Sequence, residues 1–225
     1  MGNLISNIKG LKFPDLYVTK FFFKEKLDKI TGNVLELGCG NGNNLSLFYS
    51  YEYDVVGIDI DDDEIKNARY NFENLFKTDS DNSFQFYCGD IRDLNSLLSS
   101  EVKYDVVLLP NIINYIKREE FKKLLWDLRS FLKSNGKIFI RFRSPRDMRV
   151  ALSEKVGENE YIIKSEITNE KDNYLTLYEE AEILLLINEY LKLNNFKTFH
   201  LYEENYHVDR KIFNADIVIW GDFSL

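Results

Sequence analysis

Cysteine is scarce in this sequence, since only Cys39 and Cys88 occur among its 225 residues. Two cysteines offer no disulfide framework, and neither has a nearby histidine or second cysteine in the spacing of a zinc site. We therefore expect no metal ion, and we interpret both cysteines as small buried packing residues. A chain without disulfides is typical of a reducing cytoplasm.

Long apolar runs are also missing, because no segment approaches 18 consecutive apolar residues. A helix that crosses a bilayer needs about 20 such residues, so we expect no membrane span. The first residues lack a basic region followed by an apolar core, so no secretory signal is expected either. These absences favour a cytoplasmic location.

Positive charge is in deficit: 29 Lys and Arg stand against 37 Asp and Glu, for a net charge of −8. Residues 151–225 carry the whole excess of acid. Proteins that bind nucleic acids draw much of their affinity from basic side chains on phosphates. The composition thus disfavours a nucleic-acid partner. The hydrophobic fraction of 44% suits one domain with a sizeable core.

Glycine is uncommon, but Gly38, Gly40 and Gly42 fall together directly after the apolar segment 34–37. Glycine permits positive φ and lets a ligand approach the backbone without a Cβ in the way. A strand that enters such a turn and then a helix is how doubly wound α/β domains hold nucleotide-like ligands. The spacing is G-x-G-x-G rather than the G-x-G-x-x-G of dinucleotide folds, and the acid Glu36 precedes it.

Three further apolar segments end in polar residues or turns. The segment 54–59 ends in Asp59, where a carboxylate is placed either for a ribose or as the cap of the following helix. The segment 84–88 leads into Gly89, Asp90 and Ile91. The continuous run 104–109 suits a central parallel strand. A fifth landmark is Asn135-Gly136, where we expect a helix to stop and another strand to begin.

In this order, across residues 33–143, the segments resemble class I S-adenosylmethionine-dependent methyltransferases. The resemblance implies a Rossmann-like, seven-stranded, mostly parallel sheet with helices on both faces and a C-terminal antiparallel hairpin. It implies S-adenosyl-L-methionine as cofactor and S-adenosyl-L-homocysteine as product. Asp59 would bind the ribose and Asp90 the adenine amino group. The cofactor-binding residues that it implies are Tyr17, Glu36, Gly38, Cys39, Gly40, Gly42, Asn43, Asn44, Asp59, Ile60, Gly89, Asp90, Ile91 and Leu109.

Hydrophobic periodicity predicts helices over residues 15–30, 62–76, 117–132 and 177–193, and closing strands over 196–201 and 215–220. No linker divides the chain, so we expect a single methyltransferase domain over 1–225. Within it, 1–32 form a helical cap over the cofactor and 33–143 the cofactor-binding core. Residues 144–225 then shape the acceptor site and close the sheet.

Basic residues gather where the fifth strand should end, with Arg141, Arg143, Arg146 and Arg149 around Pro145. Guanidinium groups at that edge would bind a phosphate or carboxylate, so we predict Arg141, Arg143 and Arg146 as acceptor-binding. The alternatives are a solvated charged loop, or pairing of these arginines with the acidic C-terminal region.

Histidine is as rare as cysteine, and we interpret His200 as a hydrogen-bonded strand residue. His207 lies in the predicted connection between the closing strands, and methylation of a hydroxyl benefits from a base with a pKa near neutrality. We therefore predict His207, or else Tyr206, as the catalytic residue.

The whole chain also resembles small bacterial methyltransferases that share Pro-x-x-Tyr, here Pro14 to Tyr17, and a C-terminal segment, here 214–221. The resemblance implies that Tyr17 closes over the cofactor. Asn114 would lie in the acceptor site, where many relatives have histidine. It further implies O-methylation of a sugar or phosphate-linked metabolite. N-methylation of a small amine, a non-catalytic S-adenosylmethionine-binding protein and a nucleotide-dependent oxidoreductase stay open as alternatives.

Overall fold

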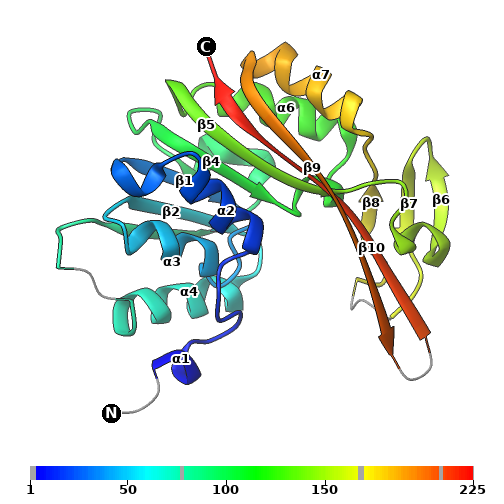
Figure 1. Cartoon of the computed structure of the whole chain (residues 1–225), viewed down its shortest axis with the longest axis horizontal. Coiled ribbons are helices and arrows are strands. Elements are labelled where there is room, and N and C mark those ends of the chain that lie inside the picture. The colour runs from blue at the N-terminus through cyan, green and yellow to red at the C-terminus, as the bar shows by residue number, and fades with distance from the viewer. Residues whose placement is uncertain (1–3, 77–78, 167–169, 208–209, 225) are drawn as a thin grey trace.

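The computed structural model describes residues 4–76, 79–166, 170–207 and 210–224. Its elements carry the labels of Figure 1. The helices are α1 (Leu4–Asn7), α2 (Leu16–Lys24), α3 (Asn43–Tyr49), α4 (Asp62–Asn74), α5 (Leu94–Leu97), α6 (Arg118–Leu128) and α7 (Glu180–Leu191), with 3-10 turns at η1 (Leu27–Lys29), η2 (Ile91–Asp93), η3 (Ile113–Tyr115) and η4 (Met148–Leu152). The strands are β1 (Asn33–Leu37), β2 (Asp54–Asp59), β3 (Phe84–Cys88), β4 (Tyr104–Pro110), β5 (Leu132–Arg143), β6 (Ser153–Gly157), β7 (Glu160–Ile163), β8 (Tyr174–Thr176), β9 (Leu193–His207) and β10 (Arg210–Phe223).

Seven strands form one sheet in the order β3-β2-β1-β4-β5-β10-β9. The first five pair in parallel, and β10 pairs antiparallel with both β5 and β9. From β1 the chain adds β2 and β3 on one side, and it then adds β4 and β5 on the other, so the strand order reverses between β1 and β4. In open α/β sheets this switch point, at the carboxyl ends of the strands, is where ligands bind. The Rossmann-like sheet with a closing antiparallel hairpin is confirmed.

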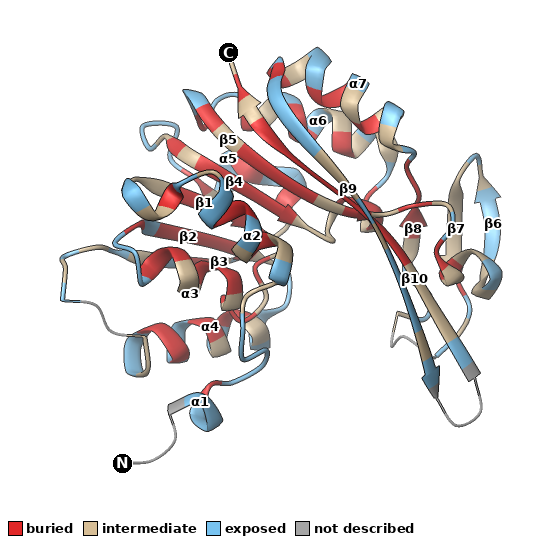
Figure 2. Cartoon of the chain, viewed as in Figure 1, coloured by how far each residue is buried: buried red, intermediate tan, exposed pale blue. Residues whose placement is uncertain are grey.

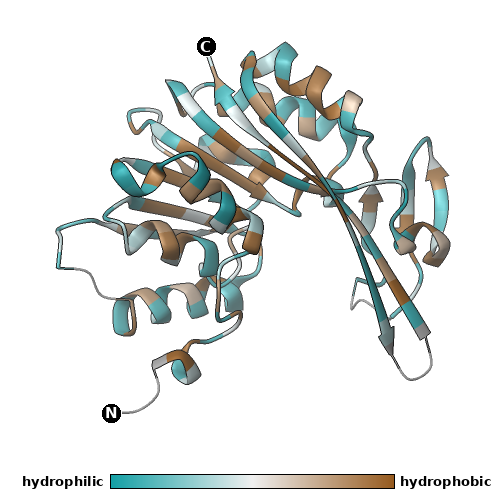
Figure 3. Ribbon diagram, viewed as in Figure 1, coloured by the Kyte–Doolittle hydropathy of each residue, from teal (hydrophilic) through white to brown (hydrophobic). Residues whose placement is uncertain are grey.

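The core lies on both faces of this sheet. One cluster joins α2, α3 and α4 to residues such as Val34, Phe139 and Trp220, and the other joins α6 and α7 to residues such as Leu35 and Ile138. Figure 2 shows the buried strands between these two layers of helices. Hydrophobic residues predominate in the same central strands (Figure 3). Consecutive residues of β1 serve opposite clusters, because side chains alternate across a strand.

The closing hairpin is longer than the sequence pattern predicts. β9 and β10 stay paired from Leu193 opposite Phe223 to His207 opposite Arg210, and the distal half projects away from the helical layers (Figure 1). Beside it lies a small antiparallel sheet in the order β6-β7-β8. We did not predict this sheet. Its strands are short, and β6 is exposed or half-exposed along its length, so it lacks a strong alternating pattern.

Helices, in contrast, are shorter than predicted. The segment 15–30 breaks after Lys24, because Lys26 takes a left-handed conformation with φ of 58° before η1. The segment 117–132 ends as a helix at Leu128, so the expectation that Asn135-Gly136 ends it is wrong. Asn135, with φ of 63°, instead lies within β5. Across the described residues, no helix is long and apolar enough to cross a membrane.

Candidate functional site

The glycine loop between β1 and α3 contains three residues with positive φ: Gly38 at 75°, Gly40 at 51° and Gly42 at 78°. A Cβ on Gly38 would lie 2.9 Å from Ile112, and one on Gly42 would lie 2.9 Å from Phe72. A Cβ on Gly40 would meet nothing closer than the Glu64 carboxylate at 3.9 Å, so only its backbone conformation requires glycine. The loop is therefore held close to its neighbours at both ends and open at Gly40.

A cavity of about 360 Å³ lies against this loop, and we call it the glycine-loop cavity. Three of the residues that line it are acidic, and none of the described residues that line it is basic. Its electrostatic character therefore suits a cationic ligand. The lining consists of Leu11, Asp15, Glu36, Gly38, Cys39, Gly40, Asn41, Asn43, Asn44, Glu64, Pro110 and Asn111.

Glu36 is the most perturbed acid of this cavity. Its side chain is 1% exposed. One oxygen, Oε1, accepts a hydrogen bond of 2.6 Å from Asn44 Nδ2, whereas Oε2 is buried without a hydrogen-bond partner. Burial raises the pKa of Glu36 to about 8, and the charges of Asp59 and Asp15 contribute in the same direction. A carboxylate in this position gains most from a cation bound beside Oε2.

The N-terminal segment 8–15 lies beside the cavity. Asn41 Nδ2 donates to the carbonyl oxygens of Lys9 and Leu11 at 2.7 and 2.9 Å. Asn43 Nδ2 donates to the carbonyl oxygen of Phe13 at 2.9 Å. These hydrogen bonds tie the segment to the glycine loop, which brings Leu11 and Asp15 into the lining.

A second, more apolar cavity of about 150 Å³ shares Gly38 with the first, and we call it the Asp90 cavity. It opens at the carboxyl ends of β2 and β3. Its lining consists of Gly38, Asp59, Ile60, Gly89, Asp90, Ile91, Arg92, Ile112, Tyr115 and Ile116. The two cavities are therefore neighbours at Gly38, near the switch point of the sheet.

Asp59 and Asp90 both have partners within the chain. Asp59 accepts hydrogen bonds from the amides of Gly40 at 2.7 Å and Asp61 at 3.0 Å, so it also fixes the glycine loop. The cap of α4 is Asp61 rather than Asp59. Arg92 hydrogen-bonds to Asp90 and lowers the pKa of that carboxyl.

Most residues that the resemblance assigned to the cofactor line these two cavities, but Gly42, Leu109 and Tyr17 do not. Leu109 is fully buried in the core, and the following Pro110 reaches the lining instead. Gly42 is the N-cap of α3. Cys39 is buried, as expected, but Cys88 is exposed, which corrects our interpretation of it as a buried residue.

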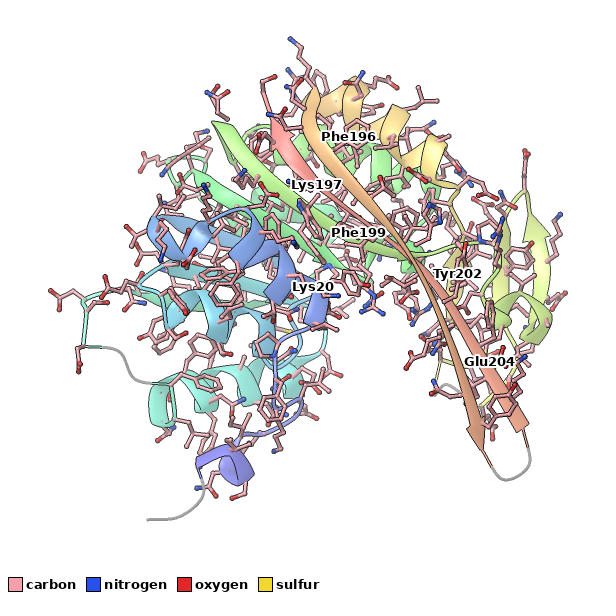
Figure 4. The ribbon with its side chains drawn as sticks, viewed as in Figure 1. Lys20, Phe196, Lys197, Phe199, Tyr202 and Glu204 are labelled. Atoms are coloured by element: carbon pink, nitrogen blue, oxygen red, sulfur yellow. The ribbon has the colours of Figure 1, made fainter. Side chains whose placement is uncertain are left out.

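A third cavity, of about 420 Å³, lies between α2 and the hairpin, and we call it the hairpin cavity. Tyr17 lines it and packs its ring against Phe199 at 5.9 Å between ring centroids. Figure 4 shows Phe199 on β9 and Lys20 on α2. The lining consists of Leu16, Tyr17, Arg141, His200, Leu201, Tyr202, Glu203, Asn214 and Asp216. An ion pair from Asp15, in the glycine-loop cavity, to Arg141 connects the two sites.

The arginines near Pro145 are largely engaged by acids. Arg141 pairs with Asp15 and Asp216. Arg143 contacts Asp216 at 3.4 Å and Glu170 at 3.3 Å. Arg149 pairs with Asp147 and Glu170, whereas the exposed Arg146 donates to the Tyr202 hydroxyl at 3.0 Å. Three of the four guanidinium groups are thus paired with carboxylates. Pairing with acidic residues was one of the two alternatives to acceptor binding.

Among the predicted acceptor and catalytic residues with described side chains, Asn114, Arg143, Arg146 and Tyr206 line none of the three cavities. Asn114 is buried, accepts from the Arg143 amide at 2.8 Å and donates to the Thr176 carbonyl at 2.6 Å, so it joins β5 to β8 rather than facing a ligand. Tyr206 is 75% exposed near the hairpin tip and hydrogen-bonds to Glu204, which Figure 4 shows far from Lys20.

His207 ends β9 opposite Arg210, and its side chain lies outside the described part of the structure. At about 3.3 Å per residue, its backbone is roughly 13 Å beyond Glu203, the last residue of β9 that lines the hairpin cavity. The exposed position of Tyr206 gives no support to a catalytic role, and the role of His207 stays a prediction.

Sequence reasoning missed Asp15 and Asn111, which both line the glycine-loop cavity. Asp15 had one signal: it is an acid directly before a helix, and it is indeed the N-cap of α2. That signal predicts a cap but not a ligand contact. Asn111 had no distinguishing signal, because its environment depends on β5 and the glycine loop together.

Comparison with known proteins connects this site to a family. A family model described as a methyltransferase domain matches residues 28–197. A solved S-adenosylmethionine-dependent methyltransferase from Methanosarcina mazei aligns with a TM-score of 0.60 and 17% identity over 84% of this chain and 92% of that one. The 1,6-didemethyltoxoflavin-N1-methyltransferase of Burkholderia thailandensis, solved with S-adenosylhomocysteine, aligns with a TM-score of 0.60 and 12% identity over 93% and 78%. A search of curated proteins finds no match.

Proposed function

Because the chain belongs to the methyltransferase domain family and is an S-adenosylmethionine-dependent enzyme, we propose that it methylates a small molecule bound in the hairpin cavity. A small polar amine fits this site best. Among the structural neighbours, the proteins named for 1,6-didemethyltoxoflavin and for magnesium protoporphyrin IX are named for small-molecule substrates. The acidic net charge of this chain is consistent with such an acceptor.

The observation that carries the cofactor assignment is the charge of the glycine-loop cavity. Asp15, Glu36 and Glu64 line it, and the described lining includes no basic residue. A pyrophosphate, as in a nicotinamide dinucleotide, would find no basic residue in this lining to balance its charge, whereas Glu64 and, once a cation binds beside it, the ionised form of Glu36 supply negative charge. A sulfonium and an ammonium group would be attracted to them. The site therefore supports S-adenosylmethionine over the oxidoreductase alternative.

The residues present fit this cofactor. Oε2 of Glu36, which is buried and unpartnered, would accept from the ammonium group. Asp59 has carboxylate lone pairs left for ribose hydroxyls after its two amide bonds. Ile60 and Ile91 would pack against the adenine beside Asp90. When bound, S-adenosylmethionine supplies a methyl carbon that its sulfonium makes electrophilic.

The preference for an amine follows from the side chains around the two larger cavities. A hydroxyl acceptor benefits from a general base, whereas a neutral amine needs only alignment of its lone pair. His200 lines the hairpin cavity, but its Nε2 contacts Glu180 of α7 at 2.6 Å. Of the charged side chains that line that cavity, Asp216 pairs with Arg141, and Glu203 adds a negative charge that disfavours a phosphate.

O-methylation of a sugar or phosphate-linked metabolite is the second candidate. One observation favours it: Nε of Arg143 is a buried donor without a hydrogen-bond partner. An anionic group that reached this atom would satisfy it. The sequence spacing of the arginines predicted an anion site. Because three of them are paired with carboxylates, the structure supports this candidate less than that spacing did.

Two measurements test the proposal. Calorimetry should detect binding of S-adenosylhomocysteine but not of NAD, and binding of NAD alone would contradict the cofactor assignment. S-adenosylhomocysteine formation should then be followed with a panel of small polyamines, amino sugars and sugar phosphates. We expect turnover with amines. Turnover confined to the sugar phosphates would reject the amine proposal in favour of the second candidate.

A further inference from the structure

The outer edge of the main sheet is formed by β9, the last strand in the order β3-β2-β1-β4-β5-β10-β9. β9 has 15 residues, which correspond to a length of about 50 Å at roughly 3.4 Å per residue. It pairs with β10 along one side, and within the described chain no strand or backbone hydrogen bond lies along its other side. A long edge strand with unpaired N–H and C=O groups is a template for pairing with another chain.

The two edges of the sheet differ in how they are protected. At the opposite edge, β3 has only five residues, and Arg69 of α4 donates to its Phe86 carbonyl at 2.6 Å. β9 contains neither proline nor glycine, and its Phe196 and Tyr202 are 49% and 50% exposed. Figure 4 shows these two aromatic side chains along β9. The features that block an edge are therefore present on β3 and scarce on β9.

A second copy of this chain fits the β9 edge, because the strand is complementary to itself. If two β9 strands pair antiparallel over their full length, Leu193 lies opposite His207, and His200 lies on the twofold axis. This register places Lys197 of each strand directly opposite Glu203 of the other. The opposite charges therefore meet twice, and cross-strand ion pairs of this kind stabilise antiparallel sheets.

Both charged residues lie on the same face of the sheet, the one that α2 covers. Lys197 forms an ion pair with Glu25 at the end of α2, and Glu203 lines the hairpin cavity beside Tyr17. The Lys197 side chain is 48% exposed, and its ammonium group has three N–H donors, so it can bind a second carboxylate. Glu203 has no ion pair within the described chain, so its charge is available to a partner.

We propose that the enzyme is a homodimer whose two β9 strands pair antiparallel about a twofold axis at His200, with Lys197 of each copy bound to Glu203 of the other. Between the two ion pairs, the same register places Phe199 opposite Leu201. Both of these side chains already pack against the core cluster beneath α2. The interface on that face of the sheet therefore has an apolar centre flanked by opposite charges.

The pairing also completes the hairpin cavity, because residues 200–203 of β9 line it. A partner strand along this edge would close the cavity on that side, and Lys197 of the partner subunit would reach its rim. The Glu203 carboxylate has two oxygens, so it can bind that lysine and still face the cavity. On the axis, Nε2 of each His200 already lies 2.6 Å from Glu180 of its own chain, so a carboxylate stands beside each of the two rings.

Sedimentation velocity on the full chain tests the proposal, and the unmodified protein should sediment as a dimer. Lys197→Glu and Glu203→Lys should each raise the dissociation constant of the dimer at least about tenfold, because each replaces two opposite-charge pairs with two like-charge pairs. When the two variants are mixed, they should form a heterodimer, since every pair is again opposite in charge. The matched control Lys211→Glu alters an exposed lysine on the inner strand β10 and should leave the dimer intact.

Circular dichroism separates loss of the dimer from loss of the fold. Lys197→Glu also breaks the ion pair with Glu25, whereas Glu203→Lys breaks none in its own chain and therefore tests the interface by itself. A monomeric unmodified protein would overturn the inference. A dimer that folded Glu203→Lys leaves intact would use another surface, and folded variants that stay monomeric when mixed would show that the two charges are not opposed. Either result would also reject the proposal.

Discussion

Replacing Glu36 with glutamine separates the electrostatic role of this residue from its packing. Glutamine keeps an oxygen that can accept from Asn44 Nδ2, which now bonds to Glu36 at 2.6 Å. It removes the negative charge that we assign to the cofactor's ammonium group. A hydrogen bond between charged groups contributes about 1.5–3 kcal/mol. We therefore expect Glu36→Gln to bind S-adenosylhomocysteine about 10- to 100-fold more weakly.

Protonation gives this prediction a second, independent readout. With a pKa of about 8, Glu36 is about nine-tenths protonated in the free protein at pH 7. A bound cation lowers that pKa, so binding should release close to one proton. Calorimetry in buffers of different ionisation enthalpy measures the proton count directly. Glu36→Gln should release none, and the control Glu73→Gln, an exposed acid of α4 outside this cavity, should release as much as the unmodified protein.

Glu36→Gln, which should weaken cofactor binding, should in contrast raise the free energy of unfolding near neutral pH. The folded-state pKa of Glu36 lies above its ordinary value of 4.5. Its contribution to the free energy of unfolding is thus fully present below about pH 4.5 and is lost as the pH rises through about 8. The loss is at most about 5 kcal/mol. Glu36→Gln lacks this loss, so it should gain stability relative to the unmodified protein between pH 5 and 8. Proton release unaffected by Glu36→Gln, or an unchanged cofactor affinity, would refute the reasoning.

Four further substitutions test other parts of the site. Asp59→Ala removes the acceptor of the Gly40 and Asp61 amides and should weaken S-adenosylhomocysteine binding at least about tenfold; Asp61→Ala, which removes only the cap of α4, should lower the melting temperature without changing that affinity. Gly40→Val should abolish cofactor binding because φ is 51°; normal calorimetric binding would exclude this loop as the binding element. Asn114→Ala should reduce the free energy of unfolding by about 2–4 kcal/mol in denaturant titrations with cofactor affinity intact; a selective loss of activity would instead restore its predicted acceptor role. His207→Ala should keep full turnover with the best acceptor from about pH 6 to 9, and a fall in kcat would restore the general-base hypothesis.

Residue type alone determined the parts of this protein that depend on local backbone geometry. The glycine loop was predictable because positive φ at Gly38, Gly40 and Gly42 requires glycine. The central strands were predictable because β4 is buried on both faces and therefore reads as a continuous apolar run. The position of Asp59 and Asp90 followed, since the ends of neighbouring parallel strands meet at one edge of the sheet.

Element lengths were predicted less well, because tertiary contacts set them. β9 and β10 extend far beyond their apolar segments, since each supplies the other with backbone partners out to the hairpin tip. The helix over 15–30 stops early at Lys24, where the chain must turn toward β1. No local pattern encodes either outcome.

Only the tertiary structure decided the chemistry of the side chains. In the sequence, Arg141 belongs to a cluster of arginines that predicts an anion site. In the fold, Asp15 and Asp216, which are 126 and 75 residues away, neutralise its charge. Glu36 is an ordinary carboxyl until burial raises its pKa. Asn111 becomes distinctive only where the fold buries its side-chain oxygen without a hydrogen-bond partner, directly after β4. Charge, protonation and unmet hydrogen bonds depend on neighbours that the chain brings together by folding, so the sequence determined the frame of the site and the fold determined its reactivity.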